Sequence, residues 1–371
     1  MRRIPSLDGL RAISIIFVLL GHLSGTRNFI NLTGMAATYA NFGVHVFFVI
    51  SGFLITSLLL NEHDKANTIS LKEFYKRRAL RIFPAAYAFV IAMTVTYWVT
   101  LRWPNILSAA TYTTNCYIYF DETGRMFMKT PWFLGHLWSL SVEEQFYLLW
   151  PALLLLFFRS RVKILVGAMI AAPVVRAVFG YLWGGQATVF PFPSVMDALA
   201  TGCLLAIIRP KLEKYQHILS APWFTLIPVI TFLLPLTRMI SNAGWRTVGL
   251  TIAHAGIALT IDNAIRRKYW ILNWRPMVWV GVLSYSLYLW QQPFLNRHSD
   301  SVWTAFPQNI ILAFLFASLS HYLVEKPFMS LRKSAKVGAQ PAEAAAKRPE
   351  SAFAAPNPAL SSAIVAADQP R

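Results

Sequence analysis

Apolar stretches of about 17 to 23 residues recur along the first 330 positions of the chain. Each is long enough to cross a hydrocarbon core of about 30 Å as a helix. Inside lipid every backbone polar group needs an internal partner, which leaves helices or closed barrels, and a strict alternation of apolar and polar residues is absent. Only 13% of the residues are charged, whereas roughly a quarter are charged in soluble domains. The sequence therefore predicts an all-α, polytopic membrane helical bundle.

The basic residues predict how this bundle is oriented. The net charge is +18, and Lys and Arg are concentrated in alternate connections between the spans, as the positive-inside rule expects of cytoplasmic segments. This distribution argues against a nucleic-acid partner and predicts that both termini are cytoplasmic, which requires an even number of spans. We expect about ten transmembrane helices, at 8–26, 39–60, 82–101, 136–157, 163–183, 195–208, 221–237, 247–264, 277–295 and 308–325.

The composition changes near residue 334. We expect residues 1–333 to form one transmembrane domain, and residues 334–371, which are rich in Ala and Pro, to form a disordered cytoplasmic tail. Cys116 and Cys203 fall in an outer loop and in a helix, so we expect no disulfide between them. Neither lies in a motif with metal-ligand spacing.

Arg11 and His22 are ionisable residues within the first predicted span. Such groups are costly in a membrane, so each is a candidate for function. Eleven residues make about three helical turns, which places both side chains on one face and about 16 Å apart along the axis. A cation near the cytoplasmic end and an imidazole farther in would suit a ligand threaded along the helix. The structural alternative is a snorkelling arginine and a core histidine.

A dense basic cluster, LKEFYKRRALRIFP, joins the second and third spans on the predicted cytoplasmic side. Arg78 and Arg81 lie one helical turn apart in it. Arginine forks suit phosphate oxygens, as in a nucleotide or coenzyme A. Basic clusters beside membranes also set topology and bind anionic lipid headgroups, and that alternative stays open.

Glu143 and Glu144 lie at the predicted outer end of the fourth span. Adjacent helical residues point about 100° apart, so one carboxylate can face inward, at a depth comparable with His22. A carboxylate that orients an imidazole is a familiar arrangement for a general base, and a structural hydrogen bond is the alternative. Arg176, within the fifth span, is expected to pair with a carboxylate such as Asp197 or Glu143, or to contact the substrate.

Six segments, in order, resemble the acyltransferase-3 family of integral membrane acyltransferases. The resemblance covers about residues 4–328. The segments are IPSLDGLRAISIIFVLLGH, with the family's Arg-x10-His signature at Arg11 and His22; GVHVFFVISGFLIT, with Ser51 and Gly52; RALR, with Arg78 and Arg81; WSLSVEEQFYLLWP, with Glu143; LSYSLYLWQQP; and YLVEKPF.

Two positions depart from the family pattern. Many relatives carry Asp where this chain has His45, and His where it has Gln291. Gln291 does not take a proton at neutral pH, which puts an acid–base role at that position in doubt. His45 is expected either to pack and form hydrogen bonds or to bind substrate.

The resemblance implies an O-acyltransferase of a bacterial inner membrane. Such an enzyme moves an acyl group, expected to be acetyl, from cytoplasmic acyl-CoA to a hydroxyl of a cell-surface or exported glycan. It implies acyl-CoA as co-substrate, no permanently bound cofactor and no metal. The expected partners are acyl-CoA, a glycan or glycolipid acceptor and membrane lipids.

The resemblance also implies roles for individual residues. His22 is expected to be catalytic, as a base or as an acylated group, with Glu143 to orient it. The other candidates are Arg11, Arg78 and Arg81 for acyl-CoA binding, and Arg176, Ser51, His45 and Gln291 as polar residues that contact substrate or support the structure.

Three other functions stay open at this point. The chain could acylate a small molecule such as a macrolide or a lipid, or it could transport acylated glycan substrates as a flippase. An inactive scaffold is the third alternative. The sequence shows no repeat of inverted topology, which argues against the transporter, and the intact Arg11, His22, Arg78 and Arg81 argue against the scaffold. The acyl group, the acceptor and the oligomeric state are left undetermined.

Overall fold

A computed structural model describes residues 3–120, 133–183 and 190–331, and within these ranges the chain is helical, with no β-strand. All ten segments that we predicted as spans lie mainly on helices, which confirms the all-α fold. The helices belong to one compact unit that ends at Met329. The predicted tail at 334–371 lies outside the described residues.

Eight helical segments of the described chain are long and apolar enough to cross a membrane. They are Pro5–Leu23, Gly34–Ala66, Leu71–Thr96, Phe158–Leu182, Phe192–Leu219, Pro222–Met239, Asn242–Arg267 and Gln308–Leu331. Two predicted spans are not among them. The helix α15 (Arg275–Trp290) has only 16 residues, and α7 (Leu137–Leu156) contains the polar run Glu143, Glu144 and Gln145. The number of about ten therefore stays a prediction, as does the orientation of the termini.

The remaining elements follow the chain in order. The longer helices are α1 (Pro5–Leu23), α2 (Thr33–Ala66), α3 (Leu71–Thr96), α8 (Arg161–Trp183), α9 (Phe192–Leu212), α13 (Leu250–Arg267) and α16 (Gln308–Ser320). The shorter ones are α4 (Trp103–Ala110), α5 (Thr114–Phe120), α10 (Gln216–Leu219), α11 (Leu226–Leu233), α12 (Asn242–Gly244) and α14 (Trp270–Asn273). Two π-helical turns, η6 (Trp245–Gly249) and η8 (His321–Glu325), continue into α13 and follow α16.

The 34-residue helix α2 packs against α1 on one side and α9 on the other. Its crossing with α9 is close because each helix contributes a glycine. A Cβ atom at Gly52 would collide with the carbonyl oxygen of Leu199, and one at Gly202 with that of Val49. Small residues at a crossing let helix backbones approach in a membrane, where van der Waals packing replaces the hydrophobic effect between helices. This crossing fixes the position of α2, which carries one wall of the site described below.

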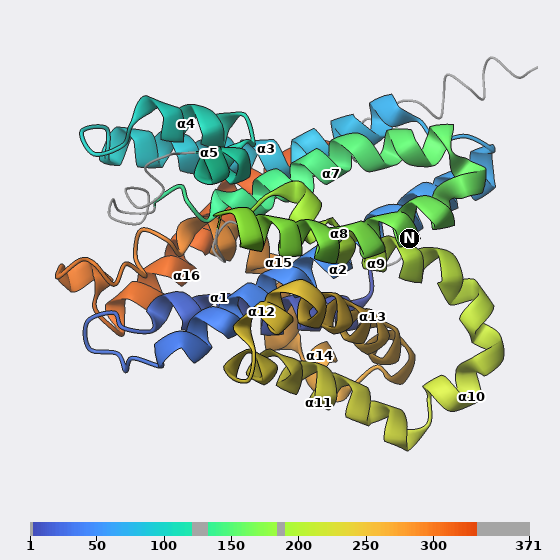
Figure 1. Cartoon of the computed structure of the whole chain (residues 1–371). Coiled ribbons are helices and arrows are strands. Elements are labelled where there is room, and N and C mark those ends of the chain that lie inside the picture. Colours follow the sequence, from blue (N-terminus) through green and yellow to red (C-terminus); the bar gives the residue numbers. More distant parts are fainter. Residues whose placement is uncertain (1–2, 121–132, 184–189, 332–371) are drawn as a thin grey trace, which may run out of the picture. The chain divides into compact units, whose positions relative to one another are not determined.

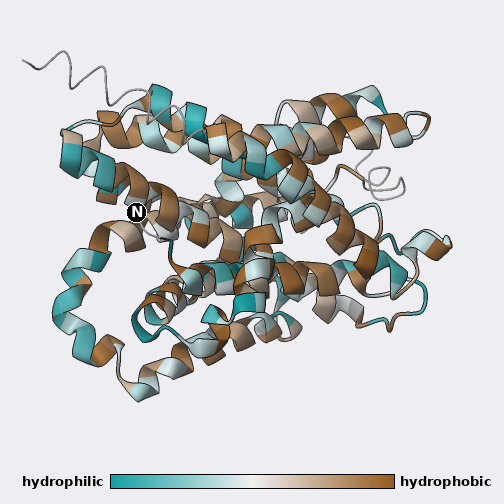
Figure 2. Cartoon of the chain, turned by 180° about the vertical axis from the view of Figure 1, so that it is seen from behind, coloured by the Kyte–Doolittle hydropathy of each residue, from teal (hydrophilic) through white to brown (hydrophobic). Residues whose placement is uncertain are grey.

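Polar residues gather at the two ends of the helical bundle (Figure 2). The start of α1, the connection between α2 and α3, and α10 lie towards one end of the bundle, whereas α4 and the connection before α16 lie towards the other (Figure 1). Apolar residues cover most of the helices between these ends (Figure 2). This arrangement matches what a bilayer requires of a spanning bundle.

Candidate functional site

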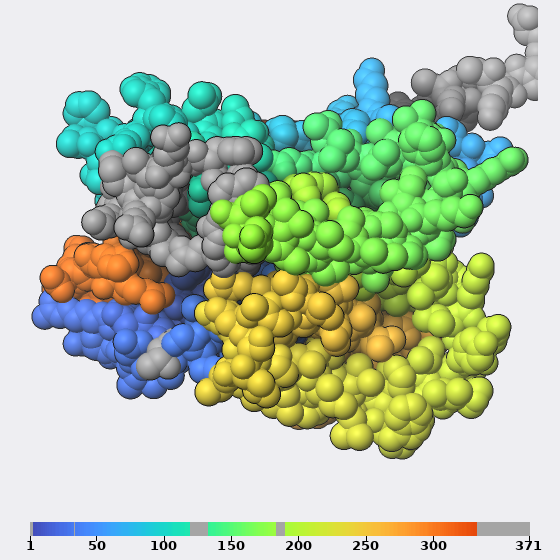
Figure 3. All heavy atoms as spheres, in the orientation of Figure 1, coloured from blue at the N-terminus to red at the C-terminus, as the bar shows by residue number. Residues whose placement is uncertain are grey.

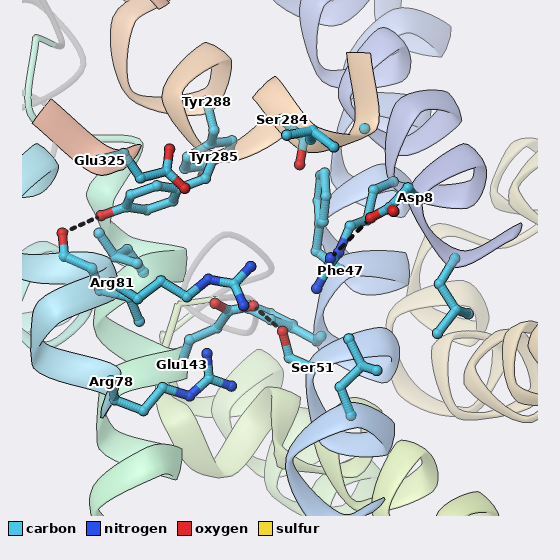
Figure 4. A pocket seen from close by; sticks show the side chains of 18 of the residues that line it. Asp8, Phe47, Ser51, Arg78, Arg81, Glu143, Ser284, Tyr285, Tyr288 and Glu325 are labelled. Carbon is cyan, nitrogen blue, oxygen red and sulfur yellow. Dashed lines mark hydrogen bonds and ion pairs between the residues drawn. The ribbon is translucent and has the colours of Figure 1, made fainter. Parts of the chain in front are cut away.

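A cavity of about 490 Å³ opens between α1, α2, α3, α7, α15 and the π-helical turn η8 (Figure 4). Its volume is in the range that holds a small-molecule ligand. Segments from both ends of the chain meet in its wall. Its ionisable Arg, Asp, Glu and His lining residues are Arg3, Arg11, Arg78, Arg81, Asp8, Glu143, His321 and Glu325.

The four arginines differ in how their charge is compensated. Arg3 Nε lies 2.6 Å from Asp8 Oδ2, and Arg11 Nη1 lies 3.5 Å from Asp8 Oδ1. Arg78 and Arg81 form no salt bridge with any described residue. The Arg78 guanidinium instead stacks 4.3 Å above the Tyr147 ring. Arg78 and Arg81 point into the cavity (Figure 4), so they offer donor forks to an anionic ligand.

Glu143 faces the same cavity from α7. Its carboxylate accepts hydrogen bonds from Ser51 Oγ at 2.8 Å and from Tyr147 OH at 3.2 Å. Its neighbour Glu144 is not among the cavity-lining residues, as the 100° between adjacent helical positions leads us to expect. Ser51 and Glu143, two of the sequence-predicted residues, are thus brought together. The expected contact between Glu143 and His22 is not among the hydrogen bonds of the described residues.

His22 is held instead by Gln291, the residue directly after α15. Its Nδ1 lies 2.8 Å from Gln291 Oε1, and Gln291 Nε2 donates to Gln292 Oε1 at 3.0 Å. An amide oxygen only accepts hydrogen bonds, so Nδ1 carries the proton and Nε2 is left with its lone pair. The partner that orients the imidazole is therefore Gln291. His22 is partly buried and does not line the cavity that Arg11 lines.

A short hydrogen-bonded chain leads from the cavity lining to the backbone of His136. Tyr288 and Ser139, both cavity-lining, bond to each other through their hydroxyls. Tyr288 OH also donates to the backbone carbonyl of His136 at 2.7 Å. Sequence reasoning did not single out His136, although it begins the segment HLWSLSVEEQ that contains Glu143.

Two further cavity groups were also missed from the sequence. In η8, His321 Nδ1 lies 2.9 Å from Glu325 Oε2, which also accepts from Ser286 Oγ at 3.1 Å. The spacing of four residues in HYLVEKPF was the available signal. Asp8 was the other omission, and its position one turn before Arg11 was the signal. A π-helical turn is an uncommon element that is frequent at functional sites.

Arg176 forms a buried ion pair away from the cavity. Its Nη1 and Nη2 each lie 3.0 Å from one oxygen of Asp197, and it also donates to the carbonyls of Ser194 and Thr247. Both partners of the pair are fully buried. Of the two carboxylates that the sequence offered, Arg176 uses Asp197. On the face seen in Figure 3, α8 and the segment 242–267 lie side by side.

His45 joins the same buried cluster. Its Nδ1 lies 3.0 Å from His254 Nε2, and His254 Nδ1 lies 3.1 Å from Asp197 Oδ2. His45 does not line the cavity, although its neighbours Val44 and Phe47 do. The packing and hydrogen-bonding interpretation of His45 therefore fits the structure, and His254 is a partner that sequence reasoning missed.

The geometry defines what the site can do. Arg78 and Arg81, which have no salt bridge to the residues that the structure describes, mark one part of the cavity, and the Glu143 carboxylate with its two hydroxyl donors faces the same cavity. Outside the cavity lining, the His22 imidazole is bonded through Nδ1 to Gln291 and presents a lone pair at Nε2, which is the requirement for a general base or nucleophile.

Curated proteins with related sequences are bacterial O-acetyltransferases by name. The chain is 31% identical over 364 residues to peptidoglycan O-acetyltransferase OatA of Listeria monocytogenes, a match that covers 87% of this chain and 55% of that protein. It is 28% identical over 363 residues to O-acetyltransferase OatA of Staphylococcus aureus, covering 88% of this chain and 57% of that protein. The chain thus spans little more than half the length of these relatives.

No solved structure matches the chain significantly. A family model described as an acyltransferase domain matches residues 4–324, which includes all of α1, α2, α3, α7 and α15, five of the helices that line the cavity. With the six segments, the cavity and this match in agreement, the chain belongs to the acyltransferase-3 family of multi-pass membrane proteins.

Proposed function

We propose that this protein is an O-acyltransferase that moves an acyl group, expected to be acetyl, from cytoplasmic acyl-CoA to a hydroxyl of a cell-envelope glycan. The observation that carries the proposal is the cavity, where Arg78 and Arg81 form no salt bridge within the described part of the chain and face a volume of about 490 Å³. Arginine forks bind phosphate oxygens in pairs, and the phosphates of coenzyme A are the corresponding ligand.

The transfer requires the thioester to reach His22. In the proposed step His22 Nε2 takes the proton of the acceptor hydroxyl, whose oxygen bonds to the thioester carbonyl carbon. The C–S bond breaks and the thiolate of coenzyme A leaves. An acyl group carried transiently on the imidazole is the other form of the same chemistry. Gln291 holds the ring in the required tautomer in both forms.

Two further parts of the proposal rest on the relatives. The two relatives described above are bacterial proteins named as O-acetyltransferases, and the one from Listeria monocytogenes is named for peptidoglycan. An envelope glycan as acceptor and a bacterial inner membrane as the location follow from these names by similarity. We also propose that Glu143, which accepts hydrogen bonds from Ser51 and Tyr147, helps to form the part of the cavity that binds acyl-CoA.

The test is acetyl-CoA turnover by the purified, detergent-solubilised chain, followed as free thiol release. We expect slow hydrolysis or transfer in the wild type, and its loss in His22→Ala while the melting temperature is kept. Binding of coenzyme A is measured in parallel by calorimetry. Equal thiol release by His22→Ala and wild type would refute the role of His22, and a wild type that binds no coenzyme A would favour the transporter.

A further inference from the structure

Glu325 is a carboxylate that lines the cavity from the end of the π-helical turn η8, and the residue is only 4% exposed. Its Oε2 atom accepts hydrogen bonds from Ser286 Oγ at 3.1 Å and from His321 Nδ1 at 2.9 Å. Both bonds go to the same oxygen, so Oε1 accepts none from the residues that the structure describes. Oε1 is also not one of the fully enclosed polar atoms that lack a partner, which means that it reaches open space. Its lone pairs are therefore available to a donor in the cavity.

The Glu325 carboxylate and Arg81 lie on the same side of the cavity, beside Tyr285 (Figure 4). The elements that carry them, η8 and α3, pack against each other. Arg81 nevertheless forms no salt bridge with Glu325, whose paired group is His321. A buried carboxylate needs such a partner, because removing its charge from water is costly. The cavity therefore offers a guanidinium and a separate hydrogen-bond acceptor, and neither one neutralises the other.

The carboxylate lies partway along α15, between the cavity arginines and His22. Tyr285 OH donates to the backbone carbonyl directly after Arg81, at 2.7 Å, and so joins α15 to α3. The next residue, Ser286, holds the carboxylate. Gln291, which directly follows α15 and holds His22, lies about 7–8 Å farther along the helix axis. An elongated ligand that binds at Arg81 and extends towards His22 would run past the carboxylate.

Coenzyme A presents two kinds of polar group to such a cavity. Its phosphates are anionic, so a carboxylate repels them. Its pantetheine arm is neutral and carries a hydroxyl and amide N–H groups, which are hydrogen-bond donors. The arm ends in the sulfur that bears the acyl group, so it is the part that must extend from the phosphates towards His22. A carboxylate oxygen between the arginines and His22 therefore suits the arm and not the phosphates.

We propose that Glu325 is a binding residue for the pantetheine arm of acyl-CoA, with Oε1 accepting a hydrogen bond from a hydroxyl or amide N–H of the arm. The inference rests on the proposed function and names a contact for its donor substrate. Ser286 and His321 hold the carboxylate in place through Oε2. The contact transfers no proton and forms no covalent bond, so it acts on the affinity and the position of the arm.

The test compares two ligands by calorimetric titration of the full chain in detergent. The first is coenzyme A, and the second is adenosine 3′,5′-bisphosphate, which carries phosphates but no arm. Glu325→Gln keeps one oxygen for Ser286 and His321 and turns an amide NH₂, a donor, towards the cavity. We expect this variant to bind coenzyme A about 10- to 100-fold more weakly than the wild type, as the loss of one hydrogen bond to a charged group implies.

The affinity of Glu325→Gln for the bisphosphate should be kept or raised, because a negative charge near the arginines is removed. Glu144→Gln is the matched control. It makes the same substitution at a carboxylate that does not line the cavity, and it should leave both affinities unchanged.

Each result decides the proposal. Wild-type affinity for coenzyme A in Glu325→Gln would overturn it, and so would an equal loss for both ligands, which a purely structural role predicts. If Glu325→Gln does not fold, Glu325→Asp, which withdraws the carboxylate by one methylene, must show the same selective loss. A wild type that binds coenzyme A no more tightly than the bisphosphate would also overturn it, because the arm then adds nothing to binding. A wild type that binds neither ligand contradicts the proposed function itself.

Discussion

The hydrogen bond between His22 and Gln291 determines which proton-transfer reactions the imidazole can perform. The bond of 2.8 Å places the proton on Nδ1, because Gln291 turns its amide nitrogen towards Gln292. In serine hydrolases a carboxylate orients the imidazole and also stabilises the imidazolium. A neutral amide provides the orientation without the charge.

Replacing Gln291 should therefore affect turnover more than binding. We expect Gln291→Leu to lower kcat for thiol release by about 10- to 100-fold, since an unoriented base loses part of the 10²- to 10⁴-fold that general-base catalysis supplies. Gln291→Glu, which keeps an acceptor for Nδ1–H, is the matched control and should retain activity. Steady-state kinetics with acetyl-CoA measure both, and an unchanged kcat in Gln291→Leu would contradict the role.

Arg78 and Arg81 should determine affinity for coenzyme A. Each charge-assisted hydrogen bond contributes roughly 1.5–3 kcal/mol, so we expect Arg78→Met and Arg81→Met each to weaken coenzyme A binding by about 10- to 100-fold. Arg77→Met is the control, because Arg77 pairs with Glu62 at 2.8 Å and does not line the cavity. Calorimetric titration measures the three variants, and equal weakening by Arg77→Met would show that the basic charge acts through the membrane surface alone.

Sequence reasoning identified these residues more easily than their partners. Spacing along one helix placed Arg11 and His22 on α1, and the resemblance selected Glu143. The partner of His22 could not be predicted, because Gln291 is 269 positions away and looked like a departure from the family pattern. Contacts between distant helices depend on packing, which the local pattern of residues does not encode.

Among the elements, the crossing of α2 and α9 depends most directly on single residues. Gly52 and Gly202 each face the backbone of the other helix without any intervening side chain. In a membrane such close backbone contact supplies much of the association between helices. The GVHVFFVISGFLIT segment therefore has a packing role besides the contact of Ser51 with Glu143.

Alanine at these glycines should destabilise the protein. Gly52→Ala and Gly202→Ala force the helices apart, at a cost of about 1–3 kcal/mol typical of overpacking, and we expect a lower melting temperature for each in detergent. Gly167→Ala on α8 is the control, since a Cβ there meets nothing within 4 Å, and its effect should stay within about 1 kcal/mol. Equal melting temperatures for all three would contradict the close crossing.

The helices themselves were largely predictable, with informative exceptions. Long apolar stretches located all ten segments, because a bilayer demands about 20 apolar residues per span. The predicted ends of the spans were less accurate, since α2 continues to Ala66, well past the predicted end at residue 60. There the polar end of α2 packs on the segment after α7, where the ring of His63 stacks on that of Phe158 at 4.0 Å. Hydropathy measures transfer into lipid and does not register such contacts.

At the scale of the whole molecule, one buried ion pair connects four long helices. Arg176 from α8 and Asp197 from α9 meet Thr251 and His254 of α13, and His254 reaches His45 of α2. This cluster joins α2 to α8, α9 and α13. It lies outside the cavity, which is lined by other residues of α2.

Removing one partner of this pair should cost more stability than removing both. We expect Arg176→Met to destabilise the fold by about 3–5 kcal/mol, because it leaves Asp197 buried without its two guanidinium contacts. The double variant Arg176→Met with Asp197→Leu carries neither charge and should recover much of the loss. Thermal unfolding of the single and double variants tests this, and a double variant that melts below Arg176→Met would contradict it.

The predicted orientation can be tested on two loops that the structure places at one end. Arg27 Nη1 donates to the carbonyl of Asp300, and Phe306 N donates to the carbonyl of Arg27, so the loops after α1 and after α15 are tied together. Lys65 lies at the other end of α2, a helix of 34 residues and about 50 Å in length. A membrane whose plane is perpendicular to the axis of α2 would therefore lie between Lys65 and Asp300.

Positive-inside reasoning predicts that the Lys65 end is cytoplasmic. In a variant with Cys116 and Cys203 replaced by alanine, we expect Asp300→Cys to react with a membrane-impermeant maleimide in intact spheroplasts, and Lys65→Cys to react only after permeabilisation. Both side chains are exposed, so access to the reagent depends on the membrane alone. The reverse pattern would move the Arg78 and Arg81 cavity to the outer face, away from cytoplasmic acyl-CoA, and the donor proposed here would then be wrong even if His22 proved catalytic.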